Sequence, residues 1–589
     1  MKPWLVSLAL FNGAGLLCAP LACSEKGEHQ GGHESSVKEA PDSANAVSLF
    51  QIKAMPTYED ILATKQVFTP RIPWSDTYWP LSQAGLARRW GAVSTEVSPL
   101  GFSSYWRDEL SSAGQAVVDP HLSPAEKYDL LYRLRYQNTF DPAKIKADIA
   151  KLSTIELGFA STTTLLDRRQ IVNNISDQFD RSPTLRAWSP MASDGWMRWL
   201  WYTKNSQYQF LNEEGSGDDW SWMGYCHGWA AASLMHNVPK HAVMVTIDNT
   251  SVLLGEGDIR GLLTKAWADH PPQTMFFLGR RCNENTPYPS GTIPSSTADN
   301  HGATGTYTDA SGQTFTFTMM DEYLPGGAFN GRRIYQVEVD KIPGEQFLIE
   351  NTVPGGVQYY LSTEFALMKK FVETGAIDGL ASVKAVKFYG CWDVNPASLQ
   401  TLLTEYLGKK QLGFIMDRTR TGQVWNQPIY GARFNVGPLL DAGSTVDPLY
   451  RYRAIGTAYL SVVKTDVIWT TEPPAPSLTY PDNFDINHVA TSRYTYTLEF
   501  DVNHQLIGGE WGDLNPPQKN LVTPDFLFAF KPGSEPLDAL NYGFDYSGII
   551  KPIYSCSQNS GPLKSIQVDG VAVDYTDCVV SKSPSFLEK

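Results

Sequence analysis

The sequence predicts an α+β fold with a mainly helical N-terminal region, a central core and β-rich C-terminal parts. Helix signals dominate the first third. Ser123-Pro-Ala-Glu126 forms a capping box with proline at the first helical position, and Asp141-Pro opens a second helix that runs to Leu152. Later segments alternate apolar and polar residues, as in Tyr494–Asp501, which is typical of strands. Helices early in the chain and strands late in it indicate the α+β class.

Composition shifts divide the chain into six expected regions. They are a signal peptide at 1–23, a disordered linker at 24–45, a mainly helical region at 46–215, a core at 216–445, a β-rich region completing that core at 446–540, and a small C-terminal β segment at 541–589. The helical region is rich in tryptophan. We expect these side chains to form core rather than a sugar- or peptide-binding groove; they are Trp74, Trp79, Trp90, Trp106, Trp188, Trp196, Trp199 and Trp201.

The N-terminus has the features of an export signal. Lys2 precedes an apolar run, and small residues come before Cys23. Leu21-Ala22-Cys23 also resembles a bacterial lipoprotein cleavage site, which would place a lipid on Cys23. We therefore expect a secreted, periplasmic or outer-surface protein, attached to a membrane only through such an anchor. The net charge of −14 argues against a nucleic-acid partner.

The seven cysteines fit an exported protein with one thiol left over. Cys18 and Cys23 belong to the signal or the anchor, which leaves five in an oxidising compartment. We expect Cys556 to pair with Cys578, and Cys282 to pair with Cys391. Cys226 then remains unpaired, and a leftover thiol in a secreted protein is a candidate reactive group.

Cys226 lies where a Gly/Asp/Trp-rich loop meets a short apolar segment that is predicted to be helical. Small residues follow it, and Asn237 and Pro239 end the segment. A thiol at a helix N-terminus faces unpaired backbone N–H groups and the positive end of the helix dipole. We therefore expect a lowered thiol pKa and N–H groups that can stabilise an oxyanion. The alternative is a buried or disulfide-bonded cysteine without a catalytic role.

Several later elements follow from local patterns. The sequence predicts strands over His241–Asp248 and Gly413–Asp417, and helices over 258–267 and 395–408. The Gly413–Asp417 strand should be buried and end on its acid. Residues 283–312 are rich in Asn, Thr, Pro, Gly and Ser and are predicted to form a loop.

Seven segments, taken in order, resemble the transglutaminase elicitor family of secreted transglutaminases. They are Met223-Gly-Tyr-Cys-His-Gly-Trp-Ala230, Gly257-Asp-Ile-Arg-Gly-Leu-Leu263, Gly279-Arg-Arg-Cys282, Cys391-Trp-Asp-Val-Asn-Pro396, Val424-Trp-Asn-Gln-Pro428, Ile507-Gly-Gly-Glu-Trp511 and Pro524-Asp-Phe-Leu527. The resemblance covers about residues 70–530. It implies a papain-like transglutaminase core within the α+β fold, in which residues 216–445 form the catalytic part.

The resemblance implies acyl transfer from protein glutamine to an amine. A cysteine thiolate attacks the γ-carboxamide, ammonia leaves, and a lysine amine takes the acyl group. Cys226 matches the nucleophile, and Asp417 matches the acid that orients the base. The family's histidine is expected at the position of Gln400. Glutamine cannot accept a proton at neutral pH, so this departure would lower the rate by about 10² to 10⁴.

Three alternatives follow from that departure. Another histidine could act as base, with His227 and His241 as candidates. The protein could be a catalytically impaired surface binding protein with the same fold. It could also be a cysteine peptidase or amidase, in which water replaces the amine. No cofactor is expected to be required, although Asp218 and Asp219 could hold Ca²⁺; the expected partners are protein substrates.

Overall fold

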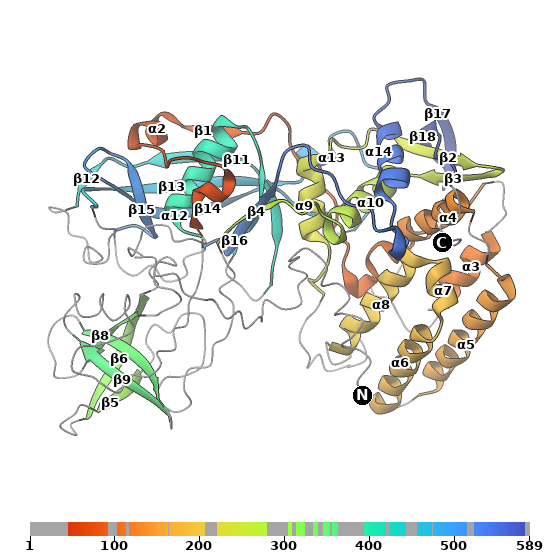
Figure 1. Ribbon diagram of the computed structural model, residues 1–589, viewed down its shortest axis with the longest axis horizontal. Helices are drawn as coiled ribbons and strands as arrows, with labels where there is room; N and C mark the ends of the chain where they lie inside the picture. Colours follow the sequence, from red (N-terminus) through yellow and green to blue (C-terminus); the bar gives the residue numbers. More distant parts are fainter. Residues whose placement is uncertain are drawn as a thin grey trace.

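The protein is described here by a computed structural model with well-defined helical and β parts (Figure 1). It describes residues 45–91, 103–112, 117–137, 140–162, 164–205, 221–279, 304–308, 314–323, 334–339, 346–353, 356–362, 394–419, 423–442, 456–473, 475–514 and 523–583. Helices gather at one end and antiparallel strands at the other, so the α+β class predicted from the sequence is confirmed.

The N-terminal helices form the end of the molecule drawn in orange in Figure 1. They are α3 (Ser104–Ser112), α4 (Pro124–Tyr136), α5 (Pro142–Ser161), α6 (Leu165–Asp180), α7 (Pro183–Trp188) and α8 (Pro190–Asn205). The predicted caps are present. The Ser123 hydroxyl accepts from the Glu126 N–H while the Glu126 carboxylate accepts from the Ser123 N–H, and Asp141 caps α5.

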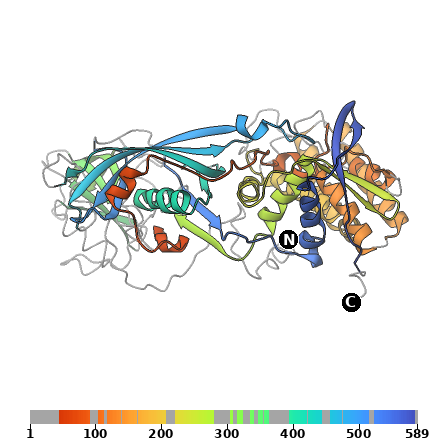
Figure 2. The same ribbon diagram turned by 90° about the horizontal axis from the view of Figure 1, so that it is seen from above.

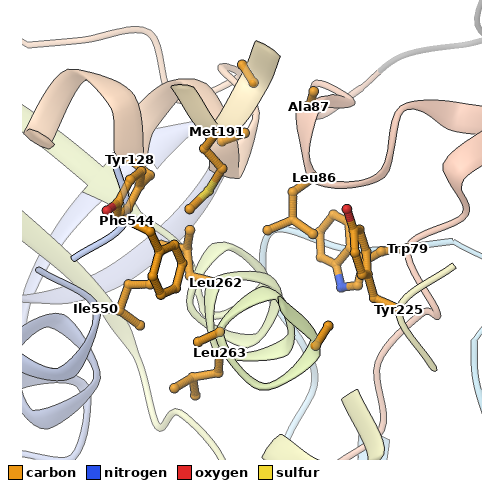
Figure 3. Close-up of a cluster of buried hydrophobic side chains, with 14 of the residues drawn as sticks. Trp79, Leu86, Ala87, Tyr128, Met191, Tyr225, Leu262, Leu263, Phe544 and Ile550 are labelled. Atoms are coloured by element: carbon orange, nitrogen blue, oxygen red, sulfur yellow. The ribbon is translucent and has the colours of Figure 1, made fainter. Parts of the chain in front are cut away.

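The expected tryptophan core is confirmed. Seven of the eight tryptophans singled out in the sequence are at most 9 % exposed, and Trp201 is half-buried against the same cluster. They pack with helix α10 (Glu256–Asp269) and with C-terminal residues. In Figure 3, Trp79 lies on one side of α10, and Phe544 lies beside Leu262 on the other. We call this cluster the first core.

A nine-stranded antiparallel sheet forms the other half. Its main path runs β15 (Leu506–Trp511), β14 (Val489–Phe500), β13 (Tyr459–Thr470), β11 (Asn426–Val436), β10 (Phe414–Asp417), β16 (Phe526–Phe530) and β4 (Met275–Gly279), with β1 (Gln66–Phe68) and β12 (Leu440–Asp441) joined to β11 and β13. The predicted strand at 413–417 is therefore confirmed as β10, and all four of its residues are buried.

The sheet separates two hydrophobic cores. Ile415 and Phe528 belong to the first core, whereas Phe414, Met416 and Leu527 belong to a second one. Adjacent strand residues point to opposite faces, so this alternation assigns one core to each face. The second core is covered by η2 (Val47–Phe50), α2 (Tyr58–Ala63), α12 (Pro396–Thr401) and the π-helix η6 (Leu402–Lys409).

The first part of the region predicted as mainly helical packs on this second face. Tyr58 and Ile61 of α2 are in the second core, and β1 pairs with β11. The short 3₁₀ turns η3 (Leu81–Gln83) and η4 (Gly85–Ala87) then lead back to the helices. Local patterns cannot show that this segment packs on the sheet before the chain returns to the helices, because β1 pairs with a strand more than 350 residues later.

Two further sheets complete the described part. β17 (Lys564–Val568), β18 (Val571–Cys578), β2 (Ala242–Ile247) and β3 (Thr250–Leu254) form one, in which β18 and β2 run parallel. The other is a meander of β5 (Thr304–Thr308), β6 (Thr314–Tyr323), β7 (Ile334–Val339), β8 (Gln346–Val353) and β9 (Gly356–Ser362). β5 lies inside the stretch 283–312 predicted as a loop, and all five of its residues pair with β6, so the loop expectation is wrong for 304–308. The rest of that stretch lies outside the described residues.

The C-terminal segment contains helices as well as the predicted β structure. η8 (Leu540–Tyr542), η9 (Tyr546–Ile550) and α14 (Lys551–Ser557) precede its hairpin, and α13 (Phe484–Asn487) lies before β14. The predicted Cys556–Cys578 disulfide is present and joins α14 to β18. A disulfide fits an extracellular protein. Within the described ranges, every helix is too short or too polar to cross a bilayer.

Candidate active site

Cys226 is the first residue of helix α9 (Cys226–Met235), as the sequence predicted, and its thiol is free and buried. Two glycines allow this placement. A Cβ at Gly224 would overlap the Tyr78 carbonyl, and a Cβ at Gly228 would overlap the Thr264 carbonyl of α10. The loop before Cys226 and the helix after it therefore both pack directly against backbone. Figure 1 shows α9 beside the end of the sheet that carries β4 and β16.

Two neighbouring strands meet the thiol. Asp417 ends β10, Asn426 begins β11, and the two residues are paired across the strands. The Asn426 amide Nδ2 donates to the Cys226 Sγ at 3.8 Å, and the thiol donates to the Val424 carbonyl at 3.9 Å. The Trp425 N–H donates to Asp417 Oδ1 at 3.2 Å. The structure thus brings two predicted site residues, Cys226 and Asp417, to one place on the sheet.

The electrostatics of the thiol differ from the sequence-based expectation. Burial is the main cause that raises the pKa of Cys226 to about 12; hydrogen bonds from Asn426 oppose this shift, and the charges of Glu472 and Asp417 contribute to it. A helix N-terminus stabilises a negative charge by about 0.3–2 kcal/mol. A shift of about three pKa units corresponds to about 4 kcal/mol. Desolvation therefore outweighs the helix dipole, and the expected lowered pKa is wrong for this arrangement.

The two histidines proposed as alternative bases face elsewhere. His227 lies against the end of α10, where burial lowers its pKa and the Asp269 charge opposes that shift. His241 contacts the carbonyls of Ala242 and Asn559 through its ring nitrogens, at 3.0 and 2.8 Å. Within the described residues, no histidine forms a hydrogen bond with Cys226.

Gln400 belongs to the opposite face of the sheet. It lies on α12 with 0 % exposure, donates to the Thr404 hydroxyl at 3.0 Å and accepts from the Tyr496 hydroxyl at 2.6 Å. Tyr496 is part of the second core, whereas α9 packs in the first. The sheet therefore separates Gln400 from the nucleophile helix. The structure does not bring Gln400 to Cys226, so the expectation that Gln400 occupies the position of the base is not supported. The sequence could not reveal this, because a linear motif does not show on which side of a sheet its helix packs.

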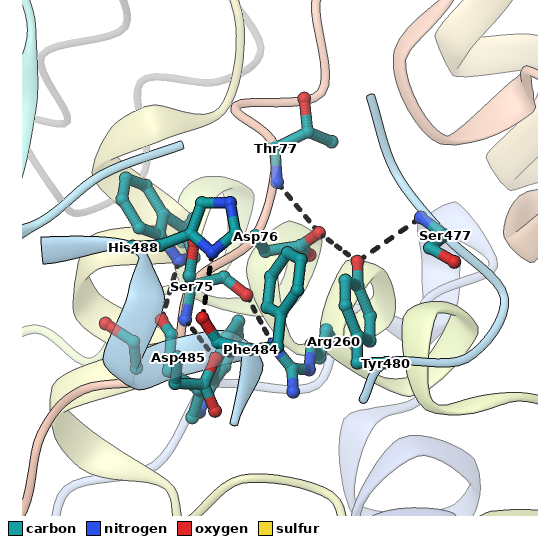
Figure 4. Close-up of polar contacts among 12 residues, drawn as sticks. Ser75, Asp76, Thr77, Arg260, Ser477, Tyr480, Phe484, Asp485 and His488 are labelled. Atoms are coloured by element: carbon teal, nitrogen blue, oxygen red, sulfur yellow. Dashed lines mark hydrogen bonds and ion pairs between the residues drawn. The ribbon is translucent and has the colours of Figure 1, made fainter. Parts of the chain in front are cut away.

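A buried polar network fixes residues 75–79, the segment that contacts Tyr225 next to Cys226 (Figure 4). Asp76 accepts hydrogen bonds from the Thr77 N–H, the Trp79 indole and the Tyr480 hydroxyl at 2.8–3.0 Å. Burial raises the pKa of Asp76 to about 6, and the nearby Arg260 charge opposes the shift. Arg260 of α10 bonds to the Ser75 carbonyl and pairs with Asp485. The network ties residues 75–79 to α10 and to the loop before β14.

This segment holds α9 and the Asn426 strand in place. The Tyr225 N–H donates to the Tyr78 carbonyl at 2.6 Å, and the Trp229 indole donates to the Trp74 carbonyl at 3.1 Å. The Tyr78 ring meets the Trp425 ring edge-on, with centroids 5.2 Å apart. Tyr78 thus contacts the residue before Cys226 and the residue before Asn426, so the surroundings of Cys226 are positioned from both the sheet and the helical half.

Sequence reasoning missed two residues of this site, Asn426 and Glu472. Asn426 lies within a segment that carried the family resemblance, nine residues after Asp417, which is hairpin spacing. That spacing could have placed it beside the acid. Glu472 reaches the site through Gln427, whose amide donates to its carboxylate at 2.6 Å, and no local signal indicates this contact. Asp218, Asp219, Cys282, Cys391, Cys18 and Cys23 lie outside the described residues.

A free, buried cysteine thus begins a helix, where an amide of an antiparallel sheet donates to its sulfur and the charge of Asp417 from the same sheet acts on it. The sequence model of the transglutaminase elicitor family matches residues 388–557, which include Asp417 and Asn426. The resemblance inferred from the sequence is therefore confirmed over that range, and Cys226 precedes it. The protein is transglutaminase-like over this part of the chain.

The GP42 transglutaminase from Phytophthora sojae has a crystal structure that resembles this one at a TM-score of 0.43 and 17 % sequence identity. The alignment covers 88 % of this chain and 100 % of that chain. A comparison with curated proteins finds no match.

Proposed function

We propose that this protein transfers acyl groups from protein glutamine to primary amines, with Cys226 as the nucleophile. The observation that supports this most directly is the free thiol of Cys226 beside Asn426 and Asp417, within a chain that matches the transglutaminase elicitor family. Attack of sulfur on the γ-carboxamide forms a thioester and releases ammonia. An amine then attacks the thioester, forms the new amide and restores the thiol.

The site as described holds the thiol in its protonated form. A pKa of about 12 leaves little thiolate at neutral pH. Acyl transfer therefore needs a group that accepts the thiol proton during attack and passes it to the departing ammonia. Asp417 and Glu472 are the carboxylates whose charges act on the thiol. We propose that Asp417 accepts this proton or orients the group that accepts it, because Asp417 is paired with Asn426 in the sheet.

A second candidate function is binding without catalysis. The observation that favours it is the surroundings of Cys226, where no imidazole of the described residues forms a hydrogen bond. In that case the fold would present a surface to a partner at the cell exterior or, through a lipid on Cys23, at a membrane. Cysteine peptidase or amidase chemistry is the hydrolytic version of the first proposal.

Incorporation of a labelled primary amine into a glutamine-rich protein tests these proposals. The full chain and its Cys226→Ala variant would be compared with and without Ca²⁺, because Asp218 and Asp219 are candidate calcium ligands. Incorporation that disappears in Cys226→Ala supports acyl transfer. Release of ammonia without incorporation indicates an amidase, and cleavage of the protein indicates a peptidase. Wild type without any of these activities supports the binding function.

A further inference from the structure

One polar atom beside the thiol lacks the hydrogen bond that burial normally demands. The Asn426 side chain is 6 % exposed, and its Nδ2 donates to the Cys226 Sγ. Its Oδ1 has no hydrogen-bond partner among the described residues. A buried amide oxygen without a partner costs about 1–3 kcal/mol, so its persistence next to a nucleophile suggests a ligand that supplies the missing donor.

The chemistry of the side chain defines that ligand. A primary amide offers N–H donors on one atom and lone pairs on the other, and it is complementary to a second primary amide. A carboxamide placed beside Asn426 could donate an N–H to Oδ1. Because Nδ2 of the same side chain is 3.8 Å from Sγ, this single contact leaves the carbonyl carbon of the ligand free to turn toward the sulfur.

The charges around the thiol favour a neutral ligand. Asp417 and Glu472 both act on Cys226 with negative charge. A carboxylate ligand would meet this charge and would also oppose the lone pairs of Oδ1 with its own oxygens. A carboxamide meets neither penalty.

We infer that Asn426 recognises the carboxamide of the acyl donor and discriminates it from a carboxylate or an ester. This inference rests on the proposed function in its choice of glutamine as donor. It assigns Asn426 one contact to the ligand: Oδ1 accepts an N–H of the carboxamide, while Nδ2 keeps its hydrogen bond to the Cys226 Sγ. After ammonia has left, the same Oδ1 is available to an N–H of the incoming amine.

Alkylation of Cys226 tests the recognition without any need for turnover. Iodoacetamide carries a primary carboxamide, whereas ethyl iodoacetate has the same leaving group and no N–H. The ratio of their rates at Cys226 would be measured at about pH 9.5 by peptide mass spectrometry on the full chain, in wild type and in Asn426→Leu. The matched control is Asn435→Leu, which makes the same change at an exposed position of β11.

The preference for iodoacetamide should fall about fivefold in Asn426→Leu and stay at the wild-type value in Asn435→Leu, as expected for loss of one hydrogen bond. Asn426→Ala, which inserts no bulk, should give the same loss, and circular dichroism would show whether each variant is folded. An unchanged ratio in folded variants would overturn the inference. So would a Cys226 that reacts with neither reagent, because a carboxamide subsite must admit iodoacetamide.

The two proposals can fail separately. Amine incorporation that is absent in wild type, together with an Asn426-dependent preference for iodoacetamide, would reject acyl transfer and keep carboxamide recognition. Incorporation that is present, with an unchanged KM for the glutamine donor in Asn426→Leu, would keep acyl transfer and reject the role of Asn426.

Discussion

The rate at which Cys226 is alkylated should report the acidity of its thiol. With a pKa of about 12, about one thiol in 10⁴ is ionised at pH 8, compared with about one in four for an ordinary cysteine with a pKa of about 8.5. This difference alone slows the reaction about 2,500-fold. A more basic thiolate is more nucleophilic, which recovers about 40-fold for a Brønsted coefficient of about 0.45. We therefore expect Cys226 to react about 60-fold more slowly than a free cysteine with a neutral reagent.

The pH profile provides the decisive form of this measurement. The rate constant for Cys226, followed by mass spectrometry of its tryptic peptide, should rise about tenfold per pH unit from pH 7 to pH 10 without a plateau. A plateau with an inflection below pH 8 would refute the reasoning, because it would show a thiolate stabilised by a nearby cation such as an imidazolium.

A single variant probes the cause of the shift. Glu472→Gln removes a negative charge that raises the pKa of the thiol and keeps an acceptor for the Gln427 amide. The alkylation rate at pH 8 should increase about 1.6- to 2.5-fold, as expected for loss of an unfavourable interaction of about 0.5–1 kcal/mol with a Brønsted coefficient of about 0.45. Glu535→Gln, at an exposed position, is the matched control and should leave the rate unchanged.

Three further predictions concern stability. Lys127→Met should lower the free energy of unfolding in urea by about 3–5 kcal/mol, because it leaves Asp258 charged and fully buried without its ion-pair partner at 2.6 Å. Gly228→Ala should lower it by about 1–3 kcal/mol, because the added Cβ forces α9 away from the Thr264 carbonyl. His121 has a raised pKa because it bonds two carboxylates. The contribution of protonated His121 to folding stability should be complete below about pH 6.5 and disappear as the pH rises through the raised pKa of His121. The Tm difference between wild type and His121→Asn should therefore shrink with rising pH.

Each of these predictions has its own control. Lys151→Met removes an exposed ion pair and should change stability by less than about 1 kcal/mol. Gly561→Ala adds a Cβ in open space, so a loss equal to that of Gly228→Ala would contradict the packing argument. For His121, the bonded carboxylates belong to Asp119 and Asp569 at 2.8 Å. A Tm difference that is constant or grows between pH 5 and pH 9 would contradict the proposed ion pairs.

Local sequence signals were sufficient for elements whose ends are fixed by short-range chemistry. The capping box at Ser123 and the cap at Asp141 predict their helices because the cap and the N–H groups that it satisfies are within three residues. The same holds for Cys226 at the start of α9 and for β10 ending on Asp417. Cysteine number and the shared C-terminal segment predicted the Cys556–Cys578 disulfide and a free Cys226, and the structure has both. The expected Cys282–Cys391 pair lies outside the described residues.

The composition of the active site depended on long-range packing. Gln400 and Cys226 both lie near helix starts in segments that resemble the family, yet the sheet places them on opposite faces. Asn426 and Glu472 reach the site through strand pairing and through a side-chain contact that spans 45 residues. No linear pattern records such contacts.

The sequence by itself determined the α+β class, the start of the helix that carries Cys226, the free thiol and the acid at the end of β10, because each follows from nearby residues or from cysteine number. Only the tertiary structure decided the acidity of the thiol. Desolvation and two carboxylates from distant parts of the chain, Asp417 at the end of β10 and Glu472 after β13, outweigh the helix N-terminus that the sequence reveals. It also decided that an amide, Asn426, is the side chain that meets the sulfur, because the neighbour of a buried atom is set by how the faces of the sheet and the helix pack.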